Sequence, residues 1–255
     1  MKVGRCVIEN QVRYVSAEDA EVRVLEGDIF GVSSPTSATY PVSSVKFCSP
    51  CDPRSFRAVG LNYAAHIERQ EHALDAERIR QDSQESRPWH KGTSCIIGHG
   101  GNIVLPLGAD YVHYEGELAI VIGHITKGIT ADQAPRYIFG YTCANYVSAE
   151  GLWSKDLSNW RRKCTDTVGP WIETDIDPHN AEIVTRLNGI VNDSGNTSEM
   201  IPNCYDIVSR MSQLVTLFPG DMILTGAPGS VEAIHPGDTI EIDISGVGTL
   251  KNFVI

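Results

Sequence analysis

Runs of β-branched residues alternate with glycine- and proline-containing turns along most of the chain. Short apolar runs bounded by turn formers are typical of β-strands. The clearest runs cover residues 103–105, 118–122, 222–224 and 239–244. Residues 205–217 instead carry apolar side chains at helical spacing, which are Ile207, Val208, Met211, Leu214 and Val215. The pattern predicts a mostly β protein with a few helices, in the α+β class.

Two segments outside these runs predict how the chain is divided. The first 47 residues hold short alternating runs broken by turn formers, and a proline-containing boundary follows at residues 48–53. We expect a small β-rich N-terminal domain over residues 1–52 and a larger domain over 53–255. The segment that begins at His66 is rich in Glu, Gln and Arg and has little apolar face. It predicts an exposed helical lid over about residues 66–89.

Charge and cysteine content narrow the class of function. The chain has 32 acidic and 21 basic residues, and its net charge of −11 argues against binding to nucleic acid. A small anionic substrate needs few cations and stays compatible with this charge. The seven cysteines are an odd number scattered along the chain, as expected in a reducing compartment. No apolar run is long enough to span a membrane and no signal peptide is evident, so we expect a cytoplasmic protein.

The strongest local candidate for a functional site is a predicted strand in which Glu115 and Glu117 lie two residues apart. Such residues share one face of a strand, here together with Ala119 and Val121. Two carboxylates that face an apolar interior are costly to bury unless a cation binds them, and oxygen ligands suit Mg²⁺, Mn²⁺ or Ca²⁺. A strand whose acidic face lies in water explains the same spacing equally well.

Three weaker candidates each have an ordinary alternative. His66 follows an apolar run and is either a general base or a surface histidine. Lys163 and Asp166 lie three residues apart, where the lysine either polarises a substrate carbonyl or belongs to a solvated basic cluster. Residues 224–229 are a strand followed by a glycine-rich turn, which either binds a carboxylate through backbone N–H groups or simply closes a hairpin.

The order and spacing of these motifs carry more information than any one of them. The series begins with Gly-Leu-Asn-Tyr-x-x-His (60–66) and Glu-x-Glu-Leu-Ala-x-Val-Ile-Gly (115–123). It continues with Gly-Tyr-Thr-x-Ala-Asn (140–145), Gly-Pro-Trp (169–171), Leu-Asn-Gly (187–189), Asn-Thr-Ser-x-Met-Ile (196–201), Pro-Gly-Asp-x-Ile-Leu-Thr-Gly (219–226) and Gly-Thr-Leu-x-Asn (248–252). From residue 56 to the C-terminus, this series resembles the fumarylacetoacetate hydrolase family. The N-terminal piece also resembles the one that many bacterial members carry.

The resemblance implies a mixed β-roll fold, a homodimer, and Mg²⁺ or Mn²⁺ at the mouth of the roll. It also implies hydrolysis or decarboxylation of small β-diketo and 2-oxo acids, although some members isomerise or dehydrate related compounds. By position, Glu115 and Glu117 match metal ligands. His66 matches the lid histidine that moves a proton, with Glu68 as an adjacent acidic catalytic residue, and Lys163 matches the lysine at the substrate carbonyl. The expected substrate-binding residues are Asn62, Tyr63, Arg69, Asp166, Thr225 and Gly226.

The chain departs from the family pattern at the metal site and in the lid. Tyr146 stands where the family has an Asp as third metal ligand, and a phenol with a pKa of about 10 is a poor ligand for Mg²⁺. Four residues on, Glu150 replaces the usual Arg, and we hypothesise that it restores a third oxygen ligand. Arg69 replaces the lid Glu, which weakens the case for a His–Glu pair that activates water.

These departures leave three interpretations of function. The first is a hydrolase or lyase that cleaves a C–C bond beside a carbonyl, as an acylpyruvate hydrolase or oxaloacetate decarboxylase does. The second is a metal-poor isomerase, dehydratase or condensing enzyme, which the loss of the Asp and the lid Glu favours. The third is an inactive ligand-binding homologue. The presence of His66, Lys163 and Thr225 favours an active enzyme over the third interpretation.

Overall fold

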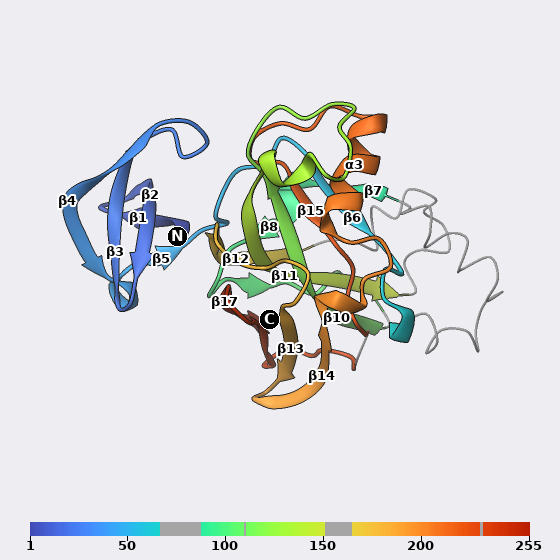
Figure 1. The fold of residues 1–255 in the computed structure, drawn as a ribbon. Coiled ribbons are helices and arrows are strands. Elements are labelled where there is room, and N and C mark those ends of the chain that lie inside the picture. Colours follow the sequence, from blue (N-terminus) through green and yellow to red (C-terminus); the bar gives the residue numbers. More distant parts are fainter. Residues whose placement is uncertain (67–87, 110, 151–164, 230–231) are drawn as a thin grey trace.

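The computed structural model describes residues 1–66, 88–109, 111–150, 165–229 and 232–255, which form two β-sheets (Figure 1). The larger sheet contains β1 (Lys2–Ile8), β2 (Gln11–Glu18), β3 (Glu21–Gly27), β4 (Ser33–Pro41), β5 (Lys46–Phe47), β6 (Phe56–Val59), β7 (Pro88–Lys91), β8 (Ile96–Ile97), β10 (Tyr111–Ile122), β11 (Ile138–Glu150), β12 (Asp166–Glu173) and β15 (Met222–Leu224). The smaller sheet contains β9 (Asn102–Ile103), β13 (Glu182–Leu187), β14 (Ile190–Asn196), β16 (Thr239–Ile244) and β17 (Gly248–Val254).

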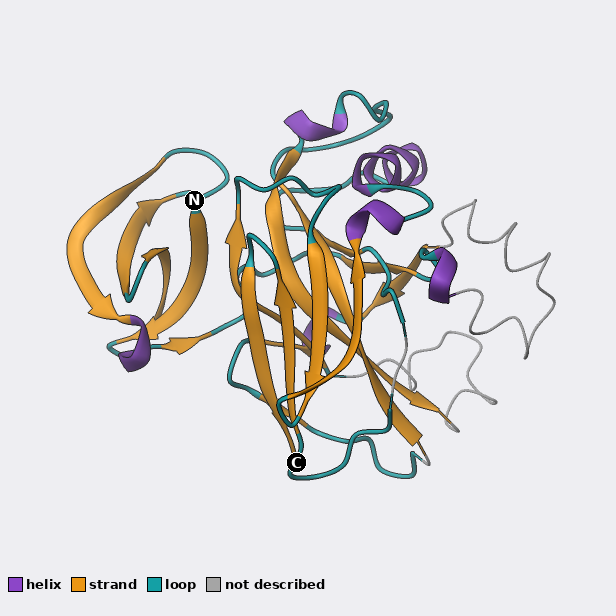
Figure 2. Cartoon of the chain, turned by 60° about the horizontal axis from the view of Figure 1, so that its bottom comes forward, coloured by secondary structure: helices purple, strands orange, loops and turns teal. Residues whose placement is uncertain are grey.

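Short helices accompany the strands. The α-helix α3 covers Cys204–Leu214, and the 3₁₀ helices are η1 (Val42–Ser44), η2 (Thr93–Cys95), η3 (Ala134–Arg136) and η5 (Thr197–Glu199). Figure 2 shows the strands as the body of the structure, with the helices at its periphery. The predicted mostly β fold with a few helices is therefore confirmed. No helix in the described ranges has the length and apolar character needed to cross a membrane.

The antiparallel pair β10 and β11 separates two apolar cores. Leu118 and Ile120 of β10 are fully buried in a cluster that also contains Ile183 and Ile242 of the smaller sheet. Residues at odd positions, such as Ala119, face a second cluster that includes Tyr146, Phe56 and Leu224. Successive side chains of a strand point to opposite faces, so an apolar strand with this alternation contributes to both cores. The predicted shared face of Glu115, Glu117, Ala119 and Val121 is the face of the second cluster.

The N-terminal strands continue the larger sheet. Its strand order is β4-β3-β2-β1-β12-β11-β10-β15-β6-β7, with β5 beside β1 and β8 beside β12. Strand β1 therefore pairs with β2 on one side and with β12 on the other, where Lys2 lies opposite Glu173. Strands β1 to β5 gather at one end of the molecule, shown in blue in Figure 1. The division into domains at residues 52 and 53 stays a prediction.

Two predicted boundaries differ from those observed. The helix predicted over 205–217 begins at Cys204, capped by Asn203, and ends at Leu214. It ends early because Val215 is extended and Leu217 forms a backbone bridge with Thr126. The lid was expected to reach residue 89, but residues 88 and 89 belong to β7, which pairs with β6. Residues 67–87 of the predicted lid lie outside the described residues.

Candidate active site

The two predicted acidic ligands lie on β10 beside the inner strands of the larger sheet. The strand register places Glu115 opposite Tyr146 and Glu117 opposite Ala144. Glu117 is 2% exposed, and its Oε2 accepts a hydrogen bond of 2.5 Å from the backbone N–H of Gly226. Burial, followed by the charge of Glu115, raises the pKa of Glu117 well above its ordinary value. The structure therefore brings Glu117 into contact with the glycine-rich turn that the sequence singled out separately.

The turn at Gly226 is held in place by Thr225 and Asn62. The Thr225 hydroxyl donates to the carbonyl of Leu118 at 2.8 Å, which ties the turn to β10. The Asn62 amide donates to the carbonyl of Thr225 at 2.7 Å and to that of Pro202 at 3.1 Å. Gly226 has a φ of +90°, and a Cβ at this position would lie 2.9 Å from the Cβ of Asn62. These predicted substrate-binding residues thus position the turn through their own side chains.

A buried ion pair lies beside these carboxylates. The Lys91 ammonium is 2.7 Å from Oδ1 and 2.6 Å from Oδ2 of Asp166, and both side chains are fully buried. Asp166 Oδ1 also accepts a hydrogen bond of 3.1 Å from the backbone N–H of Val147. Burial lowers the pKa of Lys91, against the opposing effects of Asp166 and then Glu117. Asp166, predicted to bind substrate, is engaged by Lys91 in this structure.

Tyr146 is the residue that the motif series predicts in place of a metal-binding Asp. The Lys91 ammonium lies 3.4 Å from the centroid of its ring, a cation–π contact. The Trp89 indole N–H donates to the Tyr146 hydroxyl at 2.9 Å. Burial and the nearby carboxylates, first Glu115, raise the pKa of Tyr146 well above its ordinary value. The phenol therefore stays neutral and is already bonded to Trp89.

The described side chains at this position do not fit a hard divalent cation. Such an ion prefers several anionic or carbonyl oxygens. Glu115 and Glu117 supply carboxylates, but the carboxylate of Asp166 is paired with Lys91, and the phenol of Tyr146 is neutral. Within the described ranges, no group of three or more His, Cys, Asp or Glu side chains could hold a metal ion. The charge of Lys91 instead partly offsets that of Glu117.

Strand register also bears on Glu150. Glu150 is on β11, four residues beyond Tyr146, and it pairs with Tyr111 of β10. Four residues of strand span about 13 Å, which is long for a side chain that must share an ion with Glu115 and Glu117. The side chain of Glu150 lies outside what the structure describes, so its role as a third ligand stays a prediction.

The remaining predicted residues divide into buried ones and ones that are not described. His66 is 6% exposed and is the last described residue before the gap at 67–87. Tyr63 is fully buried in the first core, where its backbone forms a bridge with Met200. The predicted catalytic and substrate-binding residues Glu68, Arg69 and Lys163 lie outside the described residues.

Sequence reasoning missed Lys91 and Trp89. Both lie in the segment that follows the charged run, and Trp89 was included in the predicted lid. Trp89 and Lys91 are two residues apart, and such residues share one face of a strand. This spacing is the local signal that could have indicated a strand there. Their partners are far away along the chain, because 57 residues separate Trp89 from Tyr146 and 75 separate Lys91 from Asp166.

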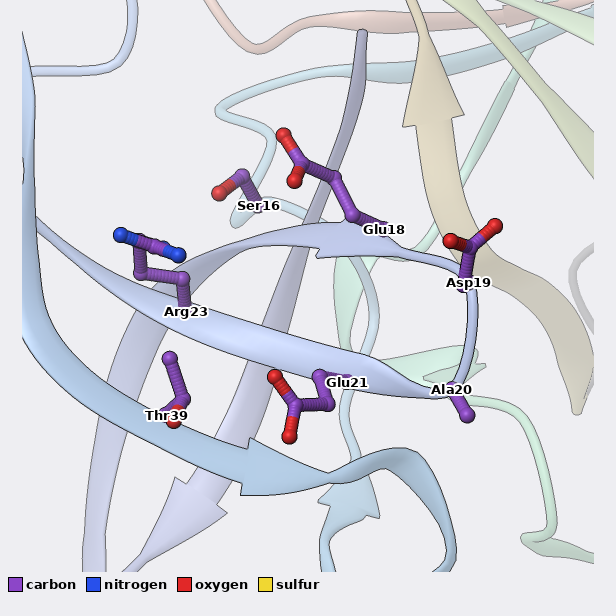
Figure 3. A pocket seen from close by; sticks show the side chains of 7 residues that line it. All are labelled: Ser16, Glu18, Asp19, Ala20, Glu21, Arg23 and Thr39. Atoms are coloured by element: carbon purple, nitrogen blue, oxygen red, sulfur yellow. The ribbon is translucent and has the colours of Figure 1, made fainter.

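A surface pocket lies elsewhere, on the N-terminal strands (Figure 3). Its lining residues are Ser16, Glu18, Asp19, Ala20, Glu21, Arg23 and Thr39. They come from β2, β3, β4 and the turn between β2 and β3. Three of them are carboxylates and one is a cation, which does not suit a small anionic substrate. We therefore place the candidate active site at Glu117 and Gly226.

The comparisons with known proteins agree with this topology and with the motif series. The model of the fumarylacetoacetate (FAA) hydrolase C-terminal domain matches residues 55–255. The chain belongs to this family. A second model, described as Rv2993c-like, N-terminal, matches residues 1–50. The family assignment made from the order of the motifs is thus confirmed.

Relatives cover the whole chain. Protein Rv2993c of Mycobacterium tuberculosis is 38% identical over 100% of this chain and 98% of its own length. A crystal structure of 5-carboxymethyl-2-hydroxymuconate delta-isomerase from Mycobacterium smegmatis is 35% identical, with a TM-score of 0.88 over 100% of this chain and 99% of that chain. The 4-hydroxyphenylacetate degradation bifunctional isomerase/decarboxylase of Salmonella dublin is 34% identical over 78% of this chain and 46% of its own length.

One structural neighbour was solved with a metal. It is the maleylpyruvate hydrolase of Sphingobium sp. SYK-6, in complex with manganese(II) and pyruvate. It is 23% identical, with a TM-score of 0.81 over 100% of this chain and 99% of that chain. At this identity the likeness establishes the shared fold. A protein of this fold therefore binds manganese(II), whereas in this chain Tyr146 and Lys91 lie beside Glu115 and Glu117.

Proposed function

We propose that the chain is an isomerase of small 2-oxo dicarboxylic acids that moves a proton at the carbon beside the carbonyl group. A base takes a proton from this carbon, and the electron pair of the C–H bond forms the enolate. The proton then returns to the oxygen or to the far end of a conjugated system. The reaction consumes no water and breaks no C–C bond.

The observation that carries this proposal is the pair of contacts made by Tyr146. Its ring lies against the Lys91 ammonium at 3.4 Å, and its hydroxyl accepts from Trp89 at 2.9 Å. A carboxylate that binds metal in the family pattern is thus replaced by a neutral group with partners of its own. The lid Glu that would help to activate water is likewise replaced by Arg69. Both changes favour proton transfer over hydrolysis.

The described residues provide part of what proton transfer requires. His66 ends the segment that Asn62 anchors to the Gly226 turn, and a histidine can exchange protons near neutral pH. Lys91 fixes a positive charge in a buried site, where charge acts more strongly than in water. We assign His66 to proton transfer and Lys91 to the electrostatics of the site. Contact between Lys163 and the carbonyl stays a prediction, as does the homodimer.

A full-length structural neighbour supports this reaction class. The isomerase from Mycobacterium smegmatis matches the chain from end to end at 35% identity. A second candidate is cleavage of a C–C bond, which the isomerase/decarboxylase of Salmonella dublin favours. That candidate requires Mg²⁺ or Mn²⁺ on Glu115 and Glu117, and a third ligand such as Glu150.

Proton NMR in D₂O distinguishes the two candidates. The protein is treated with EDTA and dialysed, and portions with and without added Mn²⁺ are incubated with oxaloacetate and with 5-carboxymethyl-2-hydroxymuconate. We expect faster keto–enol interconversion or double-bond migration, with deuterium entering beside the carbonyl and all carbons retained. Release of pyruvate or CO₂ at a comparable catalysed rate would instead establish the second candidate. If neither reaction is accelerated, the proposed substrate class is wrong.

Two histidine variants connect the reaction to the site. His66→Gln removes the proposed proton carrier, and general acid–base groups typically contribute about 10²–10⁴-fold to a rate. His124→Gln is the matched control, because His124 is exposed on a loop. We expect the first variant to lose at least about 100-fold in kcat and the control to keep the wild-type value. Equal kcat values in both variants would remove His66 from the mechanism.

Metal affinity gives an independent test. Titration of Mn²⁺ followed by electron paramagnetic resonance should show weak binding to the wild-type protein, because Tyr146 and Lys91 occupy the site. Tyr146→Asp adds a carboxylate opposite Glu115 and should bind Mn²⁺ more tightly. Tight binding of one Mn²⁺ by the wild-type chain would contradict our interpretation of the donor set.

A further inference from the structure

A second small pocket lies between β6, β7 and the end of α3, on the elements grouped near α3 in Figure 1. It has a volume of about 100 Å³ and is lined by Arg57, Pro88, Trp89, His90, Met211, Leu214 and Val215. None of these residues was predicted to bind substrate. The strand register places Arg57 opposite His90, whereas Lys91, the next residue of β7, faces the opposite side of the sheet.

Arg57 is a buried cation with no counter-ion in hydrogen-bond contact within the described ranges. It is 8% exposed, its Nη1 has no hydrogen-bond partner, and no ion pair of Arg57 is found among the described residues. Arginine stays charged in proteins, so it cannot escape burial by losing a proton. Burial of an unpaired charge is costly. Among the described residues no anion bonds to Nη1, so the position favours binding of an external one.

Asp221 is the acidic residue whose charge acts on the pKa of Arg57. Both of its carboxylate oxygens, however, already accept hydrogen bonds from the backbone. Oδ1 accepts from the backbone N–H of Ser55 at 2.8 Å, and Oδ2 accepts from that of Phe218 at 2.9 Å. Burial lowers the pKa of Arg57, and Asp221 only opposes this effect. Asp221 thus holds two loops together, and Nη1 of Arg57 has no hydrogen-bond acceptor among the described residues.

The walls of the pocket indicate the class of ligand. A guanidinium forms paired hydrogen bonds to a carboxylate. Met211, Leu214 and Val215 add an apolar wall from the end of α3. The pocket volume of about 100 Å³ is roughly the volume that three molecules occupy in liquid water. The chemistry is that of a small carboxylate with a short apolar chain.

We propose that the pocket at Arg57 is a binding site for a small organic monocarboxylate, separate from the candidate active site. The carboxylate pairs with the Arg57 guanidinium, and its apolar chain lies against α3. His90, across the strand pair, faces the same side of the sheet as Arg57. Trp89 also lines the pocket, and its indole N–H donates to Tyr146 of the candidate active site.

Calorimetric titration with sodium propionate tests the proposal. Sodium chloride and sodium phosphate at equal ionic strength are the comparison ligands. We expect saturable binding of propionate and much weaker binding of the two inorganic anions. No saturable binding of propionate overturns the proposal. Equally tight binding of chloride or phosphate overturns the assignment to an organic carboxylate.

Matched arginine variants locate the site. Arg57→Met should weaken propionate binding by about tenfold or more, since it removes the charged hydrogen-bond donors that face the carboxylate. Arg54→Met is the control, because Arg54 is exposed and lies over the ring of Phe218. Unchanged affinity in Arg57→Met, or an equal loss in both variants, would refute the assignment to Arg57.

A measurement on the wild-type protein avoids dependence on the folding of Arg57→Met. Crystals soaked in 2-bromopropionate should show anomalous density for bromine beside Arg57 and α3. Density found solely at Glu117 and Gly226 would show that the carboxylate binds in the candidate active site, and the proposal would fail. The proposed isomerase activity is assayed separately, so either proposal can fail while the other stands.

Discussion

Replacing Lys91 by Met removes one half of a buried ion pair and keeps a side chain of similar length. Both Asp166 oxygens lie within 2.7 Å of the ammonium, and both side chains have no exposed surface. Breaking such a pair from one side typically costs about 3–5 kcal/mol, because the remaining charge stays buried. The lost contact with the Tyr146 ring adds up to about 2 kcal/mol. We expect the free energy of unfolding to fall by about 3–5 kcal/mol at pH 7, because the Val147 N–H still bonds to Asp166.

Urea unfolding followed by tryptophan fluorescence measures this change. Equal m-values for the wild type and the variant would show that the two unfold in the same way, so that their midpoints can be compared. Lys46→Met is the control, because Lys46 is exposed on β5. The double variant Lys91→Met/Asp166→Asn removes both charges and should recover most of the loss. A loss below about 1 kcal/mol in Lys91→Met, or a double variant no more stable than the single one, would refute the reasoning.

The effect of pH has a definite sign. Without Lys91, the buried Asp166 carboxylate favours its protonated form, so its pKa in the folded state rises above that of the unfolded chain. A folded state that binds the extra proton becomes less stable as the pH rises through this interval. The deficit of Lys91→Met relative to wild type should therefore be smaller at pH 5 than at pH 7. An equal loss of unfolding free energy at pH 5 and pH 7 would indicate that the buried charge of Asp166 is not what destabilises the variant.

Two further predictions follow from packing and burial. In Gly60→Ala the new Cβ would lie 2.4 Å from the Trp89 ring, so we expect a loss of about 1–3 kcal/mol in urea unfolding; a wild-type midpoint would contradict the close contact. Burial raises the pKa of Cys6 and of Cys204 to about 12. At pH 8 we therefore expect N-ethylmaleimide to label these thiols in urea and not in the native protein, as read by mass spectrometry of peptides; native labelling at the unfolded rate would show that they are accessible.

The sequence by itself determined the elements with a strong local signal. Alternation along β10 predicted that Glu115 and Glu117 share a face, because strand geometry depends on neighbouring residues alone. The same holds for α3, whose apolar spacing and Asn203 cap lie within one segment. The order of the motifs also identified the family, and it predicts that Tyr146 is an altered position of the metal site.

Tertiary structure alone decided which distant side chains complete the site. Lys91 follows a charged segment and gives no sign of its role, yet it meets Asp166 and Tyr146 inside the sheet. Arg57 lies in an apolar run, and no local pattern shows that its Nη1 has no hydrogen-bond partner among the described residues. The physical reason is that burial and charge pairing depend on strands brought together across many residues of chain. Local periodicity predicts which face a side chain occupies, whereas the packing of the strands determines which charges it meets.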